Sequence, residues 1–467
     1  MLGTDSTYDD LFDEGVYQLI RYGQLIGTDT IYRHIHNQEP DATYVYNHQN
    51  SPDVTYNNTV EPLDISGLTD ADIIARFRDL NKMLVSESLE GADRIILPLS
   101  SGYDSRMLLA GAIEDEKIKS RLRCYTYTPN MSLETRPARE LARIAGVSWE
   151  KVQLPVDSFS MTRLKQVLGI FGSTQHVHGK YQLDFLEEIK HGITPGRSVL
   201  MTGYITGSAL GVSMLRTLNL CNGGMPLSEA LCVSIINNYI PDDYLALHTR
   251  RLKPEMKYQA EPELKKMLDR CVGSEDARVL VFDIWTRLRN MYSYHARVLD
   301  WGVPHIAPHF TPELLEFLFA IPKYMMVKKR NAEMMMAKYY PALEKVASNS
   351  KLTVANILKR SAACPIDGFR HYLPLLIKYY FKQPWLLSKK MIAEMKDPVL
   401  PELKCIGQDG VYPIFDLNAE SRDIFNSYFS WDEVNRLFAE AMGGSSLATK
   451  RLNILQAFAY GLKMLEK

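Results

Sequence analysis

The sequence is poor in the features that mark disulfide-rich, metal-binding or strongly charged proteins. Its 467 residues contain 6 cysteines, at positions 124, 221, 232, 271, 364 and 405, and none forms a CxxC pair. This spacing argues against a disulfide framework and a zinc site, and it favours a reducing, cytoplasmic location. The formal net charge is -1, so bulk charge gives no reason to expect nucleic acid or an anionic membrane as a partner.

Long apolar runs are also absent. No stretch approaches the roughly 18–20 apolar residues that cross a bilayer, and the most apolar late segment, 373–387, is interrupted by Lys378, Lys382 and Pro384. The acidic beginning of the chain, with Asp9 and Asp10, does not resemble a signal peptide. We therefore expect a soluble protein without a membrane segment. Its length predicts two or three domains.

Strand and helix patterns alternate in the first half of the chain. Short apolar runs predict strands and amphipathic stretches predict helices, in the order 94–99 strand, 104–113 helix, 122–128 strand, 134–145 helix and 149–154 strand, with another strand at 198–203. Strands joined by helices pair in parallel, since the crossover returns the chain in the same direction. This half predicts the α/β class with a doubly wound parallel sheet.

The flanking segments have other patterns. Alternation over 41–56 predicts a small sheet, and apolar spacing predicts a helix over 70–90. From about residue 225 the pattern is mostly helical, with strong candidates at 314–321, 332–340, 432–442 and 451–465. We expect a five-stranded parallel sheet with a small β-rich N-terminal part and a mostly helical C-terminal region.

The segment between the first buried strand and its helix has the character of a phosphate-binding loop. It reads Leu99, Ser100, Ser101, Gly102, Tyr103, Asp104, Ser105. Small residues let the backbone approach an anion, and the N-terminus of the following helix offers N–H groups and partial positive charge. Asp104 would hold Mg²⁺ against a bound polyphosphate. The alternative is that serine and aspartate only cap an ordinary helix.

This loop resembles the SGGxDS pyrophosphate loop of the asparagine synthetases and related ATP pyrophosphatases, with Ser101 in place of the first glycine. The resemblance implies a nucleotide alpha-hydrolase-like fold that binds ATP with Mg²⁺. It also implies that Thr126, Tyr127 and Thr128, on the second strand, contact the adenosine. The alternative for these three residues is ordinary strand alternation.

A second glycine-rich segment extends the resemblance. Residues 199–211 (VLMTGYITGSALG) are similar to the strand and GxGxDELxGG loop of the family, and Gly203 is predicted to contact ATP. The acidic pair of that loop is absent, because Gly207 and Ser208 stand in its place. Metal binding here must therefore differ from that of the family or be weaker.

Two later residues are predicted to be catalytic from the same resemblance. Asp300 lies in a segment, 297–322, that resembles the acceptor-binding part of the family, where a glutamate lines the pocket. Lys351 resembles a late lysine that contacts phosphates. The alternatives are a structural aspartate at 300 and a solvated lysine at 351.

A substrate-binding loop is expected just before the second glycine segment. His176, His178 and Lys180 are the candidate substrate contacts there, together with Tyr204. Two histidines spaced by one residue can also bind a metal on a strand, but no third ligand lies nearby in sequence.

Residues 23–46 resemble the last strands of the glutaminase domain that precedes the synthetase domain in the family. The resemblance divides the chain into a truncated glutaminase-like remnant (1–65), an ATP-binding synthetase domain (66–360) and a helical extension (361–467). Glutamine hydrolysis is not expected, since the first cysteine is Cys124. The nitrogen would come from ammonia, from an amine on the substrate, or from a partner protein.

The expected function is an AMP-forming ligase that adenylates a small-molecule or peptide carboxylate and forms an amide. Ring closure of a lactam or a peptide by the same chemistry is an alternative, and a homodimer is an open arrangement. Sulfur insertion into tRNA uses a similar loop, but it usually needs cysteines and a basic surface. The third alternative is a degenerate ATP-binding subunit, suggested by the missing acids at 207 and 208.

Overall fold

The computed structural model describes most of the chain outside 351–416. The described residues are 7–46, 52–57, 61–128, 135–153, 180–194, 197–204, 206–210, 214–227, 229–231, 249–271, 273–292, 303–326, 329–346, 417–442 and 445–466.

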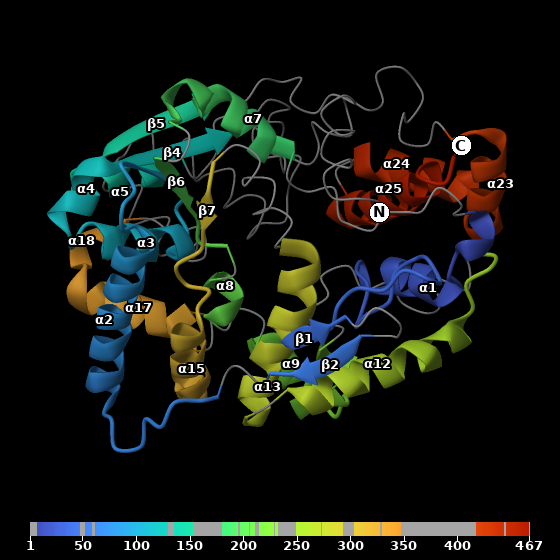
Figure 1. Ribbon diagram of the computed structural model, residues 1–467, viewed down its shortest axis with the longest axis horizontal. Helices are drawn as coiled ribbons and strands as arrows, with labels where there is room; N and C mark the ends of the chain where they lie inside the picture. The colour runs from blue at the N-terminus through green and yellow to red at the C-terminus, as the bar shows by residue number, and fades with distance from the viewer. Residues whose placement is uncertain are drawn as a thin grey trace, which may run out of the picture.

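A five-stranded parallel sheet forms the centre of one half of the molecule, in the order β5-β4-β3-β6-β7 (Figure 1). Its strands are β3 (Arg94–Pro98), β4 (Leu122–Thr128), β5 (Ser148–Gln153), β6 (Ser198–Met201) and β7 (His305–Ile306). The four strands predicted from the sequence are confirmed. The fifth, β7, has only two residues and lies inside segment 297–322.

Helices cover both faces of this sheet. Side chains alternate along each strand, so a strand that is apolar throughout presents apolar side chains on both faces. Ile95 and Leu97 of β3 point into a large core with α2 (Asp70–Ser88), α3 (Tyr103–Ala112) and α5 (Thr135–Ala145). Ile96, between them, packs on the opposite face with Phe185 of α7 (Lys180–Ile189). Figure 1 shows α7 on one side of the strands and α2 and α3 on the other. This arrangement is compatible with a doubly wound α/β fold.

The remaining helices extend the large core and then leave the sheet. In chain order they are α4 (Glu116–Arg121), α8 (Thr206–Ala209), α9 (Met214–Asn222), α12 (Lys257–Arg270), α13 (Glu275–Asp283), the π-helical η5 (Ile284–Tyr292), α15 (Pro312–Ala320), α16 (Lys323–Met326), α17 (Arg330–Tyr339), α18 (Pro341–Glu344), α23 (Ala419–Tyr428), α24 (Trp431–Met442) and α25 (Ser446–Lys463). The predicted helices at 70–90, 104–113, 134–145, 314–321, 332–340, 432–442 and 451–465 are confirmed.

The two ends of the chain share a second hydrophobic core. Helix α1 (Asp13–Tyr22) packs its buried residues, among them Val16 and Tyr17, against α23, α24 and α25. Tyr32 donates a hydrogen bond of 3.0 Å to the carbonyl of Gly461. No sequence pattern above indicates α1, so the N-terminal part is mixed in structure and not only β-rich. The predicted domain limits at 65 and 360 stay predictions.

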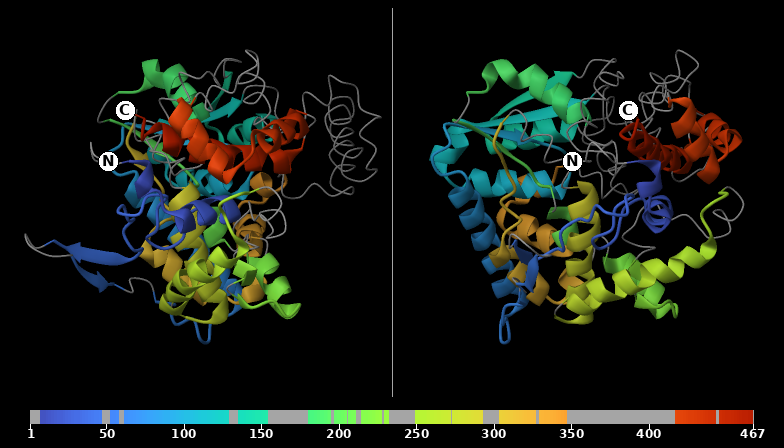
Figure 2. Two further views of the ribbon diagram at one scale, coloured as in Figure 1. Left: turned by 90° about the vertical axis from the view of Figure 1, so that its right-hand side faces the viewer. Right: turned by 45° about the vertical axis from the view of Figure 1, so that its right-hand side comes forward.

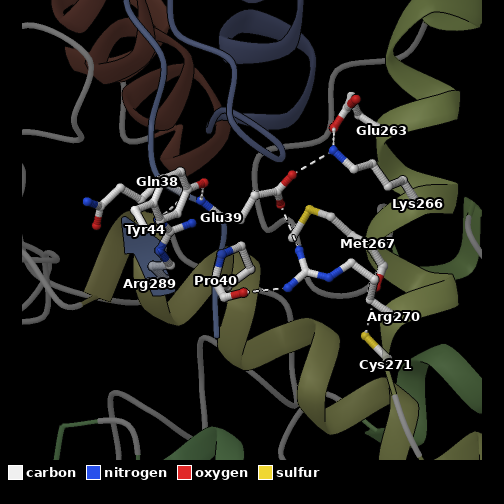
Figure 3. Close-up of polar contacts among 10 residues, drawn as sticks. All are labelled: Gln38, Glu39, Pro40, Tyr44, Glu263, Lys266, Met267, Arg270, Cys271 and Arg289. Atoms are coloured by element: carbon white, nitrogen blue, oxygen red, sulfur yellow. Dashed lines mark hydrogen bonds and ion pairs between the residues drawn. The ribbon is translucent and has the colours of Figure 1, made fainter. Parts of the chain in front are cut away.

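The predicted small N-terminal sheet is an antiparallel hairpin of β1 (Ala42–Val45) and β2 (Asp53–Tyr56). Figure 2 shows this hairpin extending from the body of the molecule. At its base the buried Glu39 carboxylate accepts bonds from Lys266 Nζ at 2.6 Å and Arg270 Nη1 at 2.8 Å (Figure 3). Arg270 also donates to the Pro40 carbonyl at 2.6 Å. These bonds attach the segment before the hairpin to helix α12.

Among the described residues, no helix is both long enough and apolar enough to cross a membrane.

Candidate functional site

The sheet has a topological switch point between β3 and β6. From β3 the chain continues to β4 and β5 on one side, whereas β6 and β7 lie on the other side. The two loops that follow β3 and β6 therefore diverge at the carboxyl edge, the usual position for ligand sites in such sheets. A cavity of about 290 Å³ lies there, lined by Pro98, Leu99, Ser100, Asp104, Ser105, Tyr125, Thr126, Tyr127, Thr202, Gly203 and Tyr204. Its volume is at the small end of ligand pockets, which span about 300–1,000 Å³.

Two serines shape the loop after β3. The Ser100 N–H donates to Ser105 Oγ at 3.0 Å, and the two hydroxyl oxygens lie 3.1 Å apart. Ser100 Oγ in turn accepts the N–H of Gly102 at 3.1 Å. One hydroxyl proton is used between the serines, and Ser105 Oγ also donates to the Ser100 carbonyl at 3.5 Å, so a ligand in the cavity that both residues line would compete with bonds inside the loop.

Helix α3 begins at Tyr103 with Gly102 at its N-cap position, and no side chain caps it. A serine nevertheless takes part at the helix start, since Ser100 Oγ accepts the Gly102 N–H, and the phosphate-binding role of the loop stays a prediction. An N-terminus without a capping side chain keeps its partial positive charge available to an anion. Asp104, in the first turn, is the one charged residue among those that line the cavity.

Tyr103 and Arg106 point away from the cavity and attach the loop to α18. Tyr103 Oη donates to the Glu344 carboxylate at 2.7 Å. The buried Arg106 guanidinium donates to the carbonyls of Ser101 at 2.8 Å and Val346 at 3.1 Å. Of the predicted loop contacts, Leu99, Ser100, Asp104 and Ser105 line the cavity, whereas Ser101, Gly102 and Tyr103 hold the loop in shape.

The wall formed by β4 is aromatic. Tyr127 stacks on Phe185 of α7 with ring centres 4.5 Å apart, and Tyr125 meets the same ring edge-on. Thr126 lines the cavity but its hydroxyl is engaged, since it donates to the Leu99 carbonyl at 2.7 Å and accepts from Trp149 Nε1 at 3.0 Å. Thr126 therefore shapes the wall. Tyr125 is buried beside Phe185, so the half-buried Tyr127 is the aromatic residue of this strand that a planar ring could contact.

The loop after β6 closes the other side of the cavity through Thr202, Gly203 and Tyr204. A Cβ atom on Gly203 would lie 2.9 Å from the backbone carbonyl carbon of Asp104, which is closer than real side chains come. Only glycine allows this loop to pack on the start of α3. Gly203, which the second glycine segment predicts as an ATP contact, thus lies directly against Asp104 at the start of α3.

A buried histidine holds the same loop from behind. His309 Nε2 lies 2.6 Å from Asn81 Oδ1, and its Nδ1 lies 2.9 Å from the Thr206 hydroxyl. Asn81 Nδ2 donates to the Met107 carbonyl, so its Oδ1 accepts and His309 donates from Nε2. Complete burial lowers the pKa of His309 to about 4. The neutral imidazole therefore joins α2, α3 and α8.

Lys329 is a site residue that the sequence pattern did not indicate. Its Nζ lies 2.6 Å from Asp104 Oδ1, although the two residues are 225 positions apart. Lys329 occupies the left-handed region, with φ 62°, at the N-cap position of α17. The positive φ of Lys329 is the feature that marks it as unusual. A backbone angle is known only from the structure, so the sequence could not indicate this residue.

Asp104 is also the residue to test against the expected Mg²⁺. Among the described residues, no group of three or more histidine, cysteine, aspartate or glutamate side chains could hold a metal. Mg²⁺ at nucleotide sites usually needs only one or two carboxylates, since phosphates and water supply the other ligands. Asp104 fits as a single ligand that would act together with a bound polyphosphate.

Several predicted residues lie outside the part of the chain that the structure describes. These are His176, His178, Asp300 and Lys351, together with the side chains of Thr128 and Lys180. Lys180 is the first residue of α7, which packs on the cavity wall through Phe185. The roles predicted for these residues stay predictions.

Neither a scan against protein-family models nor a search of curated proteins finds a match for the chain.

Proposed function

We propose that this protein is an ATP-dependent, AMP-forming ligase of the asparagine-synthetase type, which adenylates a carboxylate and then forms an amide. The observation that carries the proposal is the cavity at the switch point. It combines a helix N-terminus without a capping side chain, two serines and an aspartate with the half-buried Tyr127 of β4. These are complementary to the polyphosphate and to the adenine of one nucleotide.

The first step is attack of a substrate carboxylate oxygen on the α-phosphorus of ATP. The bond from that phosphorus to the bridging oxygen breaks, and pyrophosphate leaves. The N-terminus of α3 stabilises the charge that develops on the leaving group, and the hydroxyls of Ser100 and Ser105 add donors once they exchange their mutual bond for the phosphate. Mg²⁺, held by Asp104 and the phosphates, would supply further neutralisation.

In the second step an amine attacks the carbonyl carbon of the acyl-adenylate. The bond from carbon to the AMP oxygen breaks, AMP leaves, and the nitrogen loses a proton. Asp300 and Lys351 are the proposed acceptor-side and phosphate-side residues.

The test is to supply ATP and Mg²⁺ with a panel of amino acids, sugar acids and peptides and to measure AMP, ADP and pyrophosphate. Ring-closing substrates, which carry both groups, belong in the panel beside carboxylates given with ammonia. The matched control is Asp104→Asn, which removes the charge and keeps the shape of the side chain. Carboxylate-dependent AMP that is lost in the control supports the proposal, whereas ADP would contradict it.

A second candidate is an ATP-binding subunit without turnover, such as one that serves a partner protein. The observation that favours it is the ion pair of Asp104 with Lys329, at a site whose second loop has no acidic side chain at 207. Tight ATP binding with no AMP from any member of the panel would favour this candidate.

A further inference from the structure

We infer that His305 is a positioning residue for the second step of the proposed reaction, in which it accepts, through the hydroxyl of Thr202, the proton that the attacking amine loses. The inference rests on the proposed function, since it assumes that an acyl-adenylate forms in the cavity. It gives a destination to the proton that the nitrogen must lose when the amide forms.

His305 contacts a residue of the cavity wall. Its Nε2 lies 2.5 Å from Thr202 Oγ1, and Thr202 is one of the residues that line the cavity. Thr202 is 4% exposed, and the next residues of the same loop, Gly203 and Tyr204, line the cavity too. The imidazole of His305 also lies beside Tyr204, with ring centres 6.4 Å apart. The histidine is therefore joined to the wall that the loop after β6 forms.

The sheet fixes the position of this imidazole. β7 pairs with β6 so that His305 lies opposite Leu200. The Leu200 N–H donates to the Pro304 carbonyl at 2.8 Å, and the Thr202 N–H donates to the Ile306 carbonyl at 3.0 Å. Because these backbone bonds hold both segments, the hydroxyl and the ring nitrogen are in contact before any substrate binds. Such fixed geometry favours transfer of a proton between the two groups.

A second threonine–histidine pair in the same two segments shows how a structural pair differs. Thr206 Oγ1 lies 2.9 Å from Nδ1 of His309, and each partner stands four residues after its counterpart in the first pair. His309 is 1% exposed and its Nε2 contacts Asn81, so both of its nitrogens are used inside the protein. His305 is half-buried instead. Proton transfer requires this exposure, because the imidazolium must afterwards release its proton to water.

Amide formation needs such a proton acceptor. When a neutral amine attacks, the bond from nitrogen to carbon forms, the bond from carbon to the AMP oxygen breaks, and AMP leaves with that electron pair. The proton on the nitrogen passes to Thr202 Oγ1 as the hydroxyl proton passes to His305 Nε2, in the tautomer that carries its hydrogen on Nδ1. Thr202 is thereby regenerated. Histidine suits this role near neutral pH, whereas Asp104, the one charged residue among those that line the cavity, is paired with Lys329.

The experiment measures the two half-reactions separately, with a carboxylate that gives AMP with wild type. ATP–pyrophosphate exchange with the amine withheld or acetylated reports adenylation, and single-turnover amide formation reports the second step. The variants are His305→Gln, Thr202→Val and Thr202→Ser. We expect His305→Gln and Thr202→Val to slow amide formation by about 100-fold or more, with exchange changed by less than about twofold. Thr202→Ser, which keeps the hydroxyl, should stay near wild type.

Two comparisons distinguish a proton path from a structural role. The double variant of His305→Gln with Thr202→Val should be no slower than either single variant, because both changes remove the same path. The matched structural variants are His309→Gln and Thr206→Val, at the buried pair. Any loss of rate in these two should fall on exchange and amide formation alike, because they alter the packing of the loop and leave the proton path in place.

The contradicting outcomes separate the two proposals. If His305→Gln slows exchange and amide formation equally, or slows neither, the role of His305 is wrong and the proposed function stands. If Thr202→Val keeps the wild-type rate of amide formation, or if Thr202→Ser loses it, the proton does not pass through Thr202 and the inference is wrong as well. If wild type forms no AMP with any carboxylate, the proposed function fails and the inference fails with it.

Discussion

Two ionic contacts between distant parts of the chain differ in how completely they are satisfied. Glu39 is 7% exposed and accepts from both Lys266 and Arg270, and its own N–H donates to Tyr44 Oη at 2.6 Å. Asp104 accepts from Lys329 alone among the described residues, and it lines a cavity. The first contact is closed and joins two segments. The second keeps an oxygen for another partner.

The difference separates an ion pair that is satisfied by two cations from one that leaves a carboxylate oxygen at a cavity. Arg270 lies between the Glu39 carboxylate and the ring of Tyr56, whose centre is 3.7 Å from the guanidinium carbon. Both carboxylate oxygens of Glu39 accept a hydrogen bond from within the protein, although the Lys266 side chain is 44% exposed. Asp104 is 34% exposed and has Gly203 and Gly207 as neighbours. We therefore expect substitutions of Asp104 to alter ATP binding more than the stability of the fold. The predictions below test this separation.

The largest effect is expected from Asp104→Asn. Loss of the carboxylate should lower the rate of AMP formation by about 100-fold or more, because a charged metal ligand at the leaving group is removed. The thermal unfolding midpoint should change little, since the side chain is 34% exposed. Steady-state kinetics and calorimetry check the two halves. A large loss of stability with activity retained would contradict the prediction, because it would show that Asp104 has a structural role like that of Glu39.

His309 predicts a pH dependence of stability. Its pKa is about 4 in the folded chain, below the ordinary value of 6.5, so the folded state binds fewer protons than the unfolded state. The contribution is complete above about pH 6.5 and is lost as the pH falls toward 4, with a loss of about 2 kcal/mol at pH 5. Denaturant unfolding of wild type and His309→Gln from pH 8 to 5 measures it. Equal slopes in both proteins would contradict the prediction.

Gly203→Ala should weaken ATP binding by about tenfold, because the added Cβ forces the second loop away from Asp104. Gly224→Ala offers a control for the substitution itself, since a Cβ there meets nothing within 4 Å, although its φ of 90° adds strain. Calorimetric titration with ATP compares the two. Unchanged affinity in Gly203→Ala would mean that the two loops need not touch.

The smallest effect on function is expected from Glu39→Gln. The change leaves two cations with a weaker acceptor and should cost about 1–2 kcal/mol of local stability. Hydrogen exchange should become faster in α12 and near residue 39, because that attachment opens more often. ATP affinity should be unchanged. A loss of ATP binding would show that the closed contact and the cavity are coupled.

Much of the fold and one side of the site follow from short stretches of sequence. The strands at 94–99 and 122–128 are apolar runs, and the predicted loop contacts Leu99, Ser100 and Ser105 line the cavity. Helix α1 was not indicated, because its buried face is completed by helices from the other end of the chain. The two-residue β7 is too short for any periodicity to reveal.

The sequence by itself determined the loop between β3 and α3, since strand, small residues and helix start are contiguous and their geometry is local. Only the tertiary structure decided which residues complete it. Lys329 reaches Asp104 because α17 packs beside α3, and Gly203 reaches it because β6 lies next to β3. Such contacts depend on the packing of whole elements, and sequence spacing does not encode that packing.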